Sequence, residues 1–386
     1  MFWPHLPEKK LLMPELEKIF YPLDDSGQEQ RPWIGHGKKV EEFEEKLGKK
    51  FGLDYLVALN NGTSGLKLAL SMCDVGYGNE VITSALTCTA TNHPILEQQA
   101  IPIFTDVQYA SANLNPDDLE KRITEKTKAI VCVHWGGYPC DMDEINIIAK
   151  KYNLPVIADG AHAIGATYKG KPIGATADFT MFSLQAIKQI TTGDGGILSM
   201  IPRQSEGEFE DLKNRCWYGI DRKGRKPTVL GHPLYDVTSI GGKYHMNDIA
   251  ATIGILQLEE IDKIYSRRKE ITEKYNSKLK NIPGINLFER REDRESSNWL
   301  YTMHVEDRFQ FAKMMDSKQI ESSVVHWRND MYSVFGINTP IGKVRKLRED
   351  LPNTDKLHKD MISIPLHMRL TDDDVDYIIK SIKEGW

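Results

Sequence analysis

The chain has 386 residues, of which 40% are hydrophobic and 27% are charged, and its formal net charge is −5 at pH 7. This length and composition are typical of a globular protein with one large and one smaller domain. The mild acidity, with Lys and Arg spread along the sequence, argues against a nucleic-acid partner and against an anionic membrane surface. No run approaches the roughly 18–20 apolar residues of a membrane helix. Five scattered cysteines without a CxxC pair predict reduced thiols and a cytoplasmic protein.

The first half of the chain alternates helical patterns with short apolar runs. Residues 8–20 predict an amphipathic helix, and residues 141–152 predict another, which Asp141 is placed to cap. Runs rich in β-branched residues predict strands at 80–85, 102–107, 129–135, 155–161, 179–184 and 196–201. These runs are nearly continuous in hydrophobicity, as strands buried on both faces must be. The alternation predicts an α/β fold, in which helices flank a mostly parallel sheet.

The second half contains one unusually long helical pattern. It begins near Asn247 and runs for about 30 residues, well above the usual length of a globular helix. We expect it to leave the large domain and carry the chain into a second one. The predicted organisation is an N-terminal extension at 1–32, a large domain at 33–258 and a smaller α+β domain at 259–386. Before the long helix, the polar segment 204–239, with its glycines and prolines, predicts an ordered excursion of the kind that often serves a site.

One segment has the composition of a phosphate-binding turn, NNGTSGLKLAL (60–70). Gly62 opens a helical pattern, and Thr63 and Ser64 add hydroxyl groups to the free N–H groups of its first turn. Such a helix start attracts anions through its dipole and its unpaired donors. Ser and Thr are also common as plain N-caps, so a cap without a ligand is the alternative. No GxGxxG follows an early strand and GxxxxGK[ST] is absent, which argues against the usual dinucleotide and nucleotide-hydrolase loops.

A carboxylate and a lysine follow later strands. Asp159 ends the apolar run LPVIAD, at the kind of strand end where ligands of open α/β sheets gather, and His162 follows three residues later. Lys188 lies five residues after Ser183, and the glycine-rich TTGDGG comes next. A lysine in such a turn can act as a nucleophile when its surroundings lower its pKa. The plain structural alternatives are a helix-capping aspartate, a hydrogen-bonded turn histidine and a solvated loop lysine.

Together these groups match the needs of one cofactor, pyridoxal phosphate (PLP). The amine would hold the aldehyde and move a proton, and the phosphate would lie on the hydroxyl-rich turn. The carboxylate, about 30 residues before the lysine, would keep the pyridine nitrogen protonated, so that the ring withdraws electrons from a carbanion. No His/Cys/Asp/Glu cluster has metal-ligand spacing, so no metal is expected. GxSxG is absent, which argues against a Ser-His-Asp hydrolase.

The order of these motifs resembles that of the DegT/DnrJ/EryC1/StrS family, the sugar aminotransferases among the fold type I PLP enzymes. The resemblance runs from about Trp33 to the C-terminus. Its segments include WIGHGKKVEEFEEKLGKKFG (33–52), NNGTSGLKLAL, ADGAHAIGATYKGKPIG (158–174), FSLQAIKQITTGDGG (182–196) and GGKYHMNDIAATIGILQLE (241–259). The resemblance implies a PLP-dependent aminotransferase with a large domain around a mostly parallel sheet and a small C-terminal domain.

The resemblance also implies roles for particular residues. Lys188 matches the lysine that holds the cofactor, and Asp159 matches the partner of its pyridinium nitrogen. His162 matches the Gln or His that lies beside the cofactor's phenolic oxygen. The positions that match the family's phosphate-binding segments are Gly62, Thr63, Ser64 and Ser183.

Two further positions bear on the partner subunit and on ring packing. Lys243 falls where many members use Asn, and some Lys, to reach the phosphate from the neighbouring subunit, so the resemblance implies a homodimer with shared active sites. Cys88 stands where many members place a Phe or Trp that stacks on the cofactor ring. A thiol offers less contact area, so the packing of the ring is where this sequence departs from the family pattern.

The expected reaction is transamination. Family dehydratases carry His where this chain has Lys188, and a lysine can return reversibly to the aldehyde. Glutamate would donate the amino group and a keto-sugar nucleotide would accept it. The segment SSVVHWRNDMY (322–332) resembles the family's C-terminal substrate segment, with His326 and Arg328 as candidate contacts; a solvated strand end is the alternative. The rival functions are transfer to a small keto-phosphate or cyclitol, and cofactor binding without turnover by a regulator.

Overall fold

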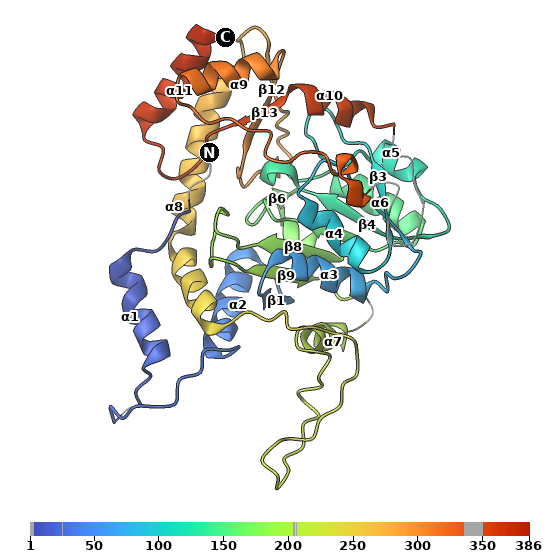
Figure 1. The fold of residues 1–386 in the computed structure, drawn as a ribbon, viewed down its shortest axis with the longest axis vertical. Helices are drawn as coiled ribbons and strands as arrows, with labels where there is room; N and C mark the ends of the chain where they lie inside the picture. The colour runs from blue at the N-terminus through green and yellow to red at the C-terminus, as the bar shows by residue number, and fades with distance from the viewer. Residues whose placement is uncertain (1–3, 25, 204, 206, 336–349) are drawn as a thin grey trace.

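The computed structural model describes residues 4–24, 26–203, 205, 207–335 and 350–386 (Figure 1). Its centre is a seven-stranded sheet in the order β1-β9-β8-β5-β4-β2-β3. These strands are β1 (Leu56–Leu59), β2 (Glu80–Ser84), β3 (Ile101–Thr105), β4 (Thr127–Val133), β5 (Val156–Asp159), β8 (Phe179–Ser183) and β9 (Gly196–Met200). The six predicted strands are confirmed, with every end within two residues of its predicted place, whereas β1 was not predicted.

Within this sheet, all strands except β9 point the same way. β2 pairs in parallel with β3 and β4, β4 pairs in parallel with β5, and β5 with β8. β9 runs antiparallel to β8 on one side and to β1 on the other. The carboxyl ends of six strands therefore meet at one edge, where open α/β sheets bind their ligands. We call this the carboxyl edge.

Helices cover both faces of the sheet (Figure 1). The helices are α1 (Lys9–Phe20), α2 (Lys38–Phe51), α3 (Gly62–Met72), α4 (Thr89–Glu97), α5 (Pro116–Lys121), α6 (Met142–Lys151), α7 (Gly207–Arg215), α8 (Asp248–Leu279), α9 (Arg308–Ser317), α10 (Pro352–Asp360) and α11 (Asp372–Gly385). Successive residues of β4 show why its run is continuously apolar. Ile130 packs into the core shared with α2, α6 and α8, whereas Val131 packs into the core shared with α3.

The C-terminal part of the chain forms a second core around a smaller sheet. This sheet is β10 (Ile285–Leu287), β12 (Tyr301–Val305) and β13 (Met361–Ile364), and α9 and α11 pack on it. A third sheet joins β11 (Arg294–Glu295), β6 (Thr167–Tyr168) and β7 (Lys171–Pro172). The predicted long helix is confirmed as α8, which has 32 residues and packs into both cores through Ile255 and Ile271. The predicted domain bounds stay a prediction, and α8 is continuous across the one at 258/259.

Two local predictions have different outcomes. The N-terminal helix is confirmed as α1, which packs against α8. The predicted cap at Asp141 is wrong, because the Asp141 carboxylate accepts no hydrogen bond from the first turn of α6. It accepts instead from Gln108 Nε2 at 2.7 Å and from Arg294 Nη1 at 2.7 Å. A buried arginine therefore outcompetes the local cap. None of the described helices is long and apolar enough to span a membrane.

Arg268 on α8 joins the two cores. Its buried guanidinium donates from Nη1 to the carbonyl oxygens of Asn298 (3.2 Å), Trp299 (3.2 Å) and Leu366 (3.1 Å), and burial lowers its pKa to about 10. We expect Arg268→Met to lower the free energy of unfolding by about 3 kcal/mol, because three buried carbonyl groups lose their donor. Denaturant unfolding measures this loss. Lys269→Met, on the exposed neighbour, should change it by less than about 0.5 kcal/mol. Equal losses in the two variants would contradict the prediction.

Candidate active site

The carboxyl edge brings together chain segments that the sequence singled out separately. Asp159 ends β5, and Ser183 ends β8. Gly62 begins α3 shortly after β1, and Cys88 immediately precedes α4, which follows β2. Lys188 lies in the turn between β8 and β9. Because the strands that precede these residues are parallel, their ends converge on one region of the molecule.

The Asp159 carboxylate is buried and held by two hydrogen bonds. Oδ2 accepts from Thr91 Oγ1 at 2.6 Å, and Oδ1 accepts from the backbone N–H of Ala161 at 3.0 Å. Burial raises the pKa of Asp159, while both hydrogen bonds and the charge of Lys188 act in the opposite direction. The carboxylate is therefore fixed in orientation inside a site of low polarity. Such a group is suited to face a cationic ring nitrogen.

Lys188 lies half-buried beside an aromatic ring. Its Nζ lies 3.8 Å from the centroid of the Trp299 ring, and its backbone N–H donates to the Gln185 carbonyl at 2.9 Å. Burial lowers the pKa of Lys188 to about 8, against the charge of Asp159, which favours the protonated amine. A pKa close to neutral leaves an appreciable fraction of the amine unprotonated at physiological pH. That fraction is nucleophilic.

Two histidines stack beside this lysine. The His162 ring lies flat on Trp299, with centroids 3.8 Å apart, and the His326 ring is nearly parallel to His162 at 5.9 Å. Burial and then the charge of Lys188 lower the pKa of both, well below the usual range for His162 and to about 4 for His326. Both rings are therefore neutral at pH 7. The Gly136 N–H donates to His162 Nδ1 at 3.3 Å, so the proton of the neutral His162 ring lies on Nε2.

The predicted phosphate contacts lie side by side. A Cβ atom on Gly62 would lie 2.6 Å from the sulfur of Met181 and 3.5 Å from Cβ of Ser183, so α3 begins packed against β8 and a larger residue here would displace the Met181 side chain. Asn61 caps α3 by accepting from the Ser64 N–H at 2.8 Å. The other N–H groups of a first helical turn have no carbonyl acceptor within the helix, so they are available to donate hydrogen bonds to an anion. Thr63 lies in the same turn and is partly exposed.

Lys243 lies outside the group formed by Lys188 and its neighbours. Its side chain is exposed, and Nζ lies 5.7 Å from the centroid of the Trp217 ring. Its carbonyl oxygen accepts from Asn60 Nδ2 at 3.1 Å, which places this backbone next to the start of α3. The predicted reach of Lys243 to the phosphate of a neighbouring subunit stays a prediction.

Arg328 is buried and already paired. Its guanidinium donates to both carboxylate oxygens of Asp330 at 2.6 Å and forms a further short ion pair with Asp355. The predicted substrate contact at Arg328 stays a prediction, and these ion pairs weigh against it. His326 is the better placed of the two, because its buried Nε2 has no hydrogen-bond partner among the described residues and its ring belongs to the stack beside Lys188.

Sequence reasoning missed Thr91 and Trp299. Thr91 is one of several threonines in SALTCTATN, and nothing in that run marks the one that faces Asp159. Trp299 lies in the segment between α8 and β12, far along the chain from Lys188. A search for aromatic residues near a lysine-bearing turn would not have found it, because only the return of the chain after α8 brings the ring to the carboxyl edge.

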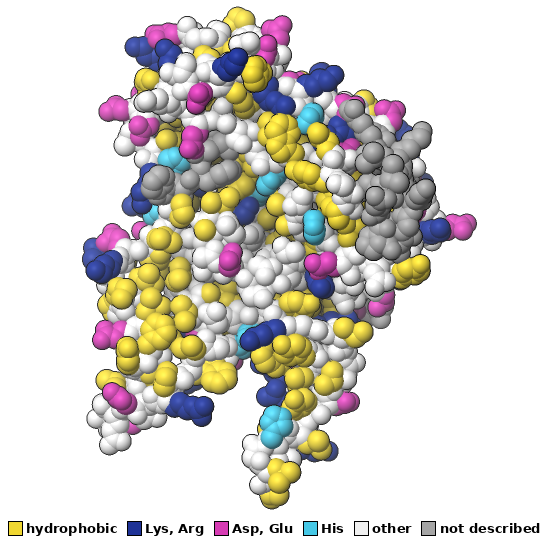
Figure 2. All heavy atoms as spheres, viewed as in Figure 1, with side chains coloured by type: hydrophobic (Ala, Val, Ile, Leu, Met, Phe, Trp, Pro, Cys, Tyr) yellow, Lys and Arg dark blue, Asp and Glu magenta, His cyan; other side chains and the backbone are white. Residues whose placement is uncertain are grey.

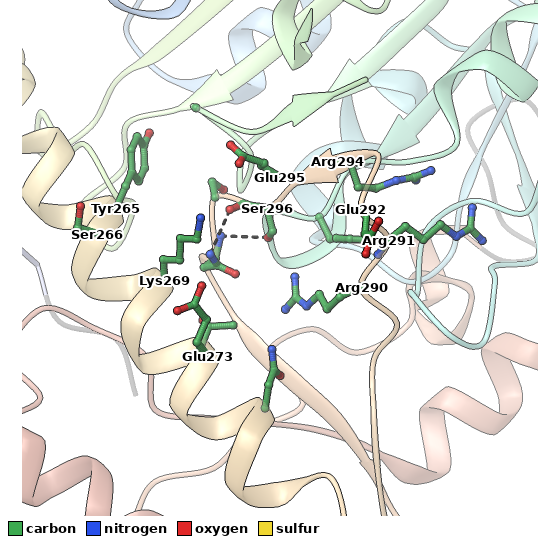
Figure 3. A pocket seen from close by; sticks show the side chains of 16 residues that line it. Tyr265, Ser266, Lys269, Glu273, Arg290, Arg291, Glu292, Arg294, Glu295 and Ser296 are labelled. Atoms are coloured by element: carbon green, nitrogen blue, oxygen red, sulfur yellow. Dashed lines mark hydrogen bonds between the residues drawn. The ribbon is translucent and has the colours of Figure 1, made fainter. Parts of the chain in front are cut away.

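A separate cavity of about 680 Å³ lies between α8 and the segment 290–298 (Figure 3). Lys269 and Arg290 line it, but so do Glu273 and Glu295, so its walls carry charges of both signs. Its lining includes neither Lys188 nor Asp159. Among the described residues, no group of three or more His, Cys, Asp or Glu side chains is placed to hold a metal ion.

The residues at the carboxyl edge fit PLP. Lys188 would hold the aldehyde, Asp159 the ring nitrogen, and the free N–H groups at the start of α3 the phosphate. When bound, this cofactor supplies a ring that withdraws electrons from the substrate carbon. A mostly parallel sheet with a lysine and a buried carboxylate at its carboxyl edge defines the protein as a fold type I PLP-dependent transferase.

The chain belongs to the DegT/DnrJ/EryC1/StrS aminotransferase family, whose family model matches residues 26–383. It is 33% identical over 364 residues to the spore coat polysaccharide biosynthesis protein SpsC of Bacillus subtilis, covering 91% of this chain and 90% of SpsC. It is 33% identical over 356 residues to the GDP-perosamine synthase of Escherichia coli O157:H7, covering 91% and 92%. The structure of the sugar aminotransferase CalS13 from Micromonospora echinospora superposes with a TM-score of 0.87 at 32% identity, over 100% of this chain and 99% of CalS13. The protein is a PLP-dependent aminotransferase.

Proposed function

We propose that this aminotransferase moves an amino group from glutamate to a keto-sugar nucleotide, in the synthesis of an amino-deoxy sugar for a surface polysaccharide or a natural product. The observation that carries the proposal is the convergence of Lys188, Asp159 and the start of α3 at one edge of the sheet. The similarity to a GDP-perosamine synthase supports a nucleotide-linked sugar as the acceptor.

Three side chains of this site have separable roles in the proposed reaction. Lys188, with a pKa of about 8, takes up and returns a proton at physiological pH at little cost. Asp159 remains ionised against a cationic ring nitrogen, because that charge offsets the cost of its burial. His162, neutral and protonated on Nε2, offers a hydrogen bond to a phenolic oxygen. The Trp135 ring contacts His162 and His326 edge-on.

We also propose a cytoplasmic homodimer with shared active sites. The segment between α7 and α8 forms an arm that projects from the body of the molecule (Figure 1), held by the bridges Ile220↔Val237 and Lys226↔Leu234. Apolar side chains lie exposed on this arm and on the N-terminal segment (Figure 2); they include Leu6, Met13, Leu23, Val229, Leu230, Val237 and Ile240. A second copy of the chain would cover them. The five cysteines are free, which agrees with a reducing compartment.

A substrate screen tests the proposed donor and acceptor. Purified enzyme is given glutamate and a panel of keto-sugar nucleotides, keto-phosphates and keto-cyclitols, and release of 2-oxoglutarate is followed. We expect kcat/KM for the best keto-sugar nucleotide to exceed that of every unlinked acceptor by about 100-fold or more, because binding energy from the remote nucleotide is available only there. A preferred keto-phosphate or keto-cyclitol would overturn the acceptor. Turnover with another amino acid but not with glutamate would overturn the donor.

A further inference from the structure

The Lys188 amine lies against the face of an aromatic ring, while the Asp159 carboxylate acts on it through its charge alone. Its Nζ lies 3.8 Å from the centroid of the Trp299 ring, well inside the range of a cation–π contact. Lys188 forms no salt bridge with any residue in the described part of the chain, and the Asp159 oxygens accept hydrogen bonds from Thr91 and Ala161. The ionisable groups that face the amine are Asp159, Cys88, His162 and His326.

Trp299 is held rigidly in this position. Its indole Nε1 donates to the carbonyl oxygen of Ile187 at 3.1 Å, so the ring is tied to the backbone immediately before Lys188. Its backbone N–H donates to the Gly136 carbonyl at 2.9 Å, and the opposite flank of the site is closed by the His162 ring at 3.8 Å. The side chain is 1% exposed. A ring fixed from so many directions can position a flexible lysine, and the flexible lysine cannot position the ring.

Transamination requires the lysine to leave the cofactor in each half of the cycle and to return to it. An amine on a four-carbon stem loses rotamer freedom when it is held near its target. A fixed π face in a desolvated site holds a protonated amine without the strong charge–charge bond that a carboxylate would form. Such a face therefore keeps the released amine close to where it must act and leaves its proton available.

We propose that Trp299 is a positioning residue, whose ring face holds the Lys188 amine whenever that amine is not attached to the cofactor. The proposal rests on the assignment of Lys188 as the transferring amine. The aromatic ring that contacts the lysine then comes from the segment between β11 and β12. It is distinct from the position of Cys88, where many family members place an aromatic side chain.

The first test uses the full chain without cofactor. Acetylation of Lys188 by acetic anhydride is followed as a function of pH and quantified on the peptide that carries it. In the unsubstituted protein we expect a midpoint near pH 8. Trp299→Phe keeps an aromatic face, whereas Trp299→Leu keeps only apolar bulk. Both side chains exclude water from the amine to a similar extent, so the variants differ mainly in whether a ring is present. The midpoint in Trp299→Leu should lie about one pH unit below that in Trp299→Phe, because the protonated amine loses its π partner.

The second test uses the holoenzyme. After glutamate has loaded the enzyme with the amino group, a keto acceptor is added, and the return of the lysine-bound cofactor is followed by its absorption in stopped flow. We expect a rate about tenfold slower in Trp299→Leu and a largely restored rate in Trp299→Phe, with the KM for glutamate unchanged. Trp386→Leu, which removes an indole packed on Phe311 in the C-terminal core, should alter neither the midpoint nor the rate.

Several results would overturn the proposal. Equal midpoints for the Phe and Leu variants would show that the ring has no electrostatic role. Equal slowing in both would assign Trp299 a packing role alone. If the Leu variant does not fold, Trp299→Met supplies the same comparison. The acetylation test needs no substrate, so failure to find an acceptor in the screen would leave the proposal for Trp299 standing. Equal midpoints in the two variants would overturn that proposal even in an active enzyme.

Discussion

Lys188→Ala should abolish amine transfer from glutamate while leaving the protein folded. The amine is half-buried and its pKa of about 8 makes it the group at the carboxyl edge that can bind an aldehyde and exchange a proton near neutral pH. Removing a group that acts as both nucleophile and proton carrier should lower kcat by about 10³–10⁴-fold. Release of 2-oxoglutarate measures the loss, and circular dichroism and size-exclusion chromatography verify the fold.

Borohydride reduction supplies a check that is independent of turnover. In the unsubstituted holoenzyme, reduction followed by peptide mapping should find the cofactor fixed on the peptide that contains Lys188. In Lys188→Ala the same treatment should leave the cofactor removable by dialysis. Lys269→Ala is a matched control, because this lysine is exposed and lines the separate cavity, away from Lys188. Its reduced holoenzyme should retain the label on Lys188. A label at another lysine, or turnover retained by Lys188→Ala, would refute the assignment.

The sequence was sufficient to predict six of the seven strands of the sheet and its carboxyl edge. Apolar runs without polar interruption fit only strands buried on both faces, and alternation with helices makes such strands parallel. Residues that follow those runs must then lie at one edge, which is why Asp159, Ser183 and Lys188 were expected to serve one site. Gly62 was grouped with them by its phosphate-binding composition alone, because β1 before it was not predicted. The structure brings them together. The chemical roles assigned to them stay predictions until they are measured.

Contacts between distant segments could not be predicted in this way. Asp141 occupies the N-cap position of α6, but its carboxylate accepts hydrogen bonds from Arg294 and Gln108 in distant segments instead of from the helix. Trp299 lies beside Lys188 only because α8 carries the chain away and the following segment brings it back. Arg328 has a charge suited to an anionic substrate, but its guanidinium is already hydrogen-bonded to Asp330, two residues later. The spacing of residues along a sequence does not show which distant residue will form a hydrogen bond or ion pair with a given polar side chain.

Asp159→Asn should lower kcat/KM by about 10³-fold and weaken cofactor retention, with the fold intact. The substitution keeps the size of the side chain but removes the charge that a cationic ring nitrogen requires. It also sets an amide N–H₂ group against either Thr91 or the N–H of Ala161, both of which now donate to the carboxylate. Steady-state kinetics and the absorption of the bound cofactor measure the two effects. Near-normal activity in this variant would remove Asp159 from the mechanism.

Thr91→Val is the matched control, because it keeps the Asp159 carboxylate and removes one of its two donors. The Thr91 hydrogen bond lowers the pKa of Asp159, so its loss raises that pKa further above the usual value. A raised pKa means that the carboxylate is protonated, and its charge lost, as the pH falls. The defect in Thr91→Val should therefore be modest near pH 8, about tenfold or less, and should grow in acid, whereas that of Asp159→Asn should persist at every pH. A loss in Thr91→Val that is equally large at alkaline pH would show that Thr91 acts on something other than the charge of Asp159.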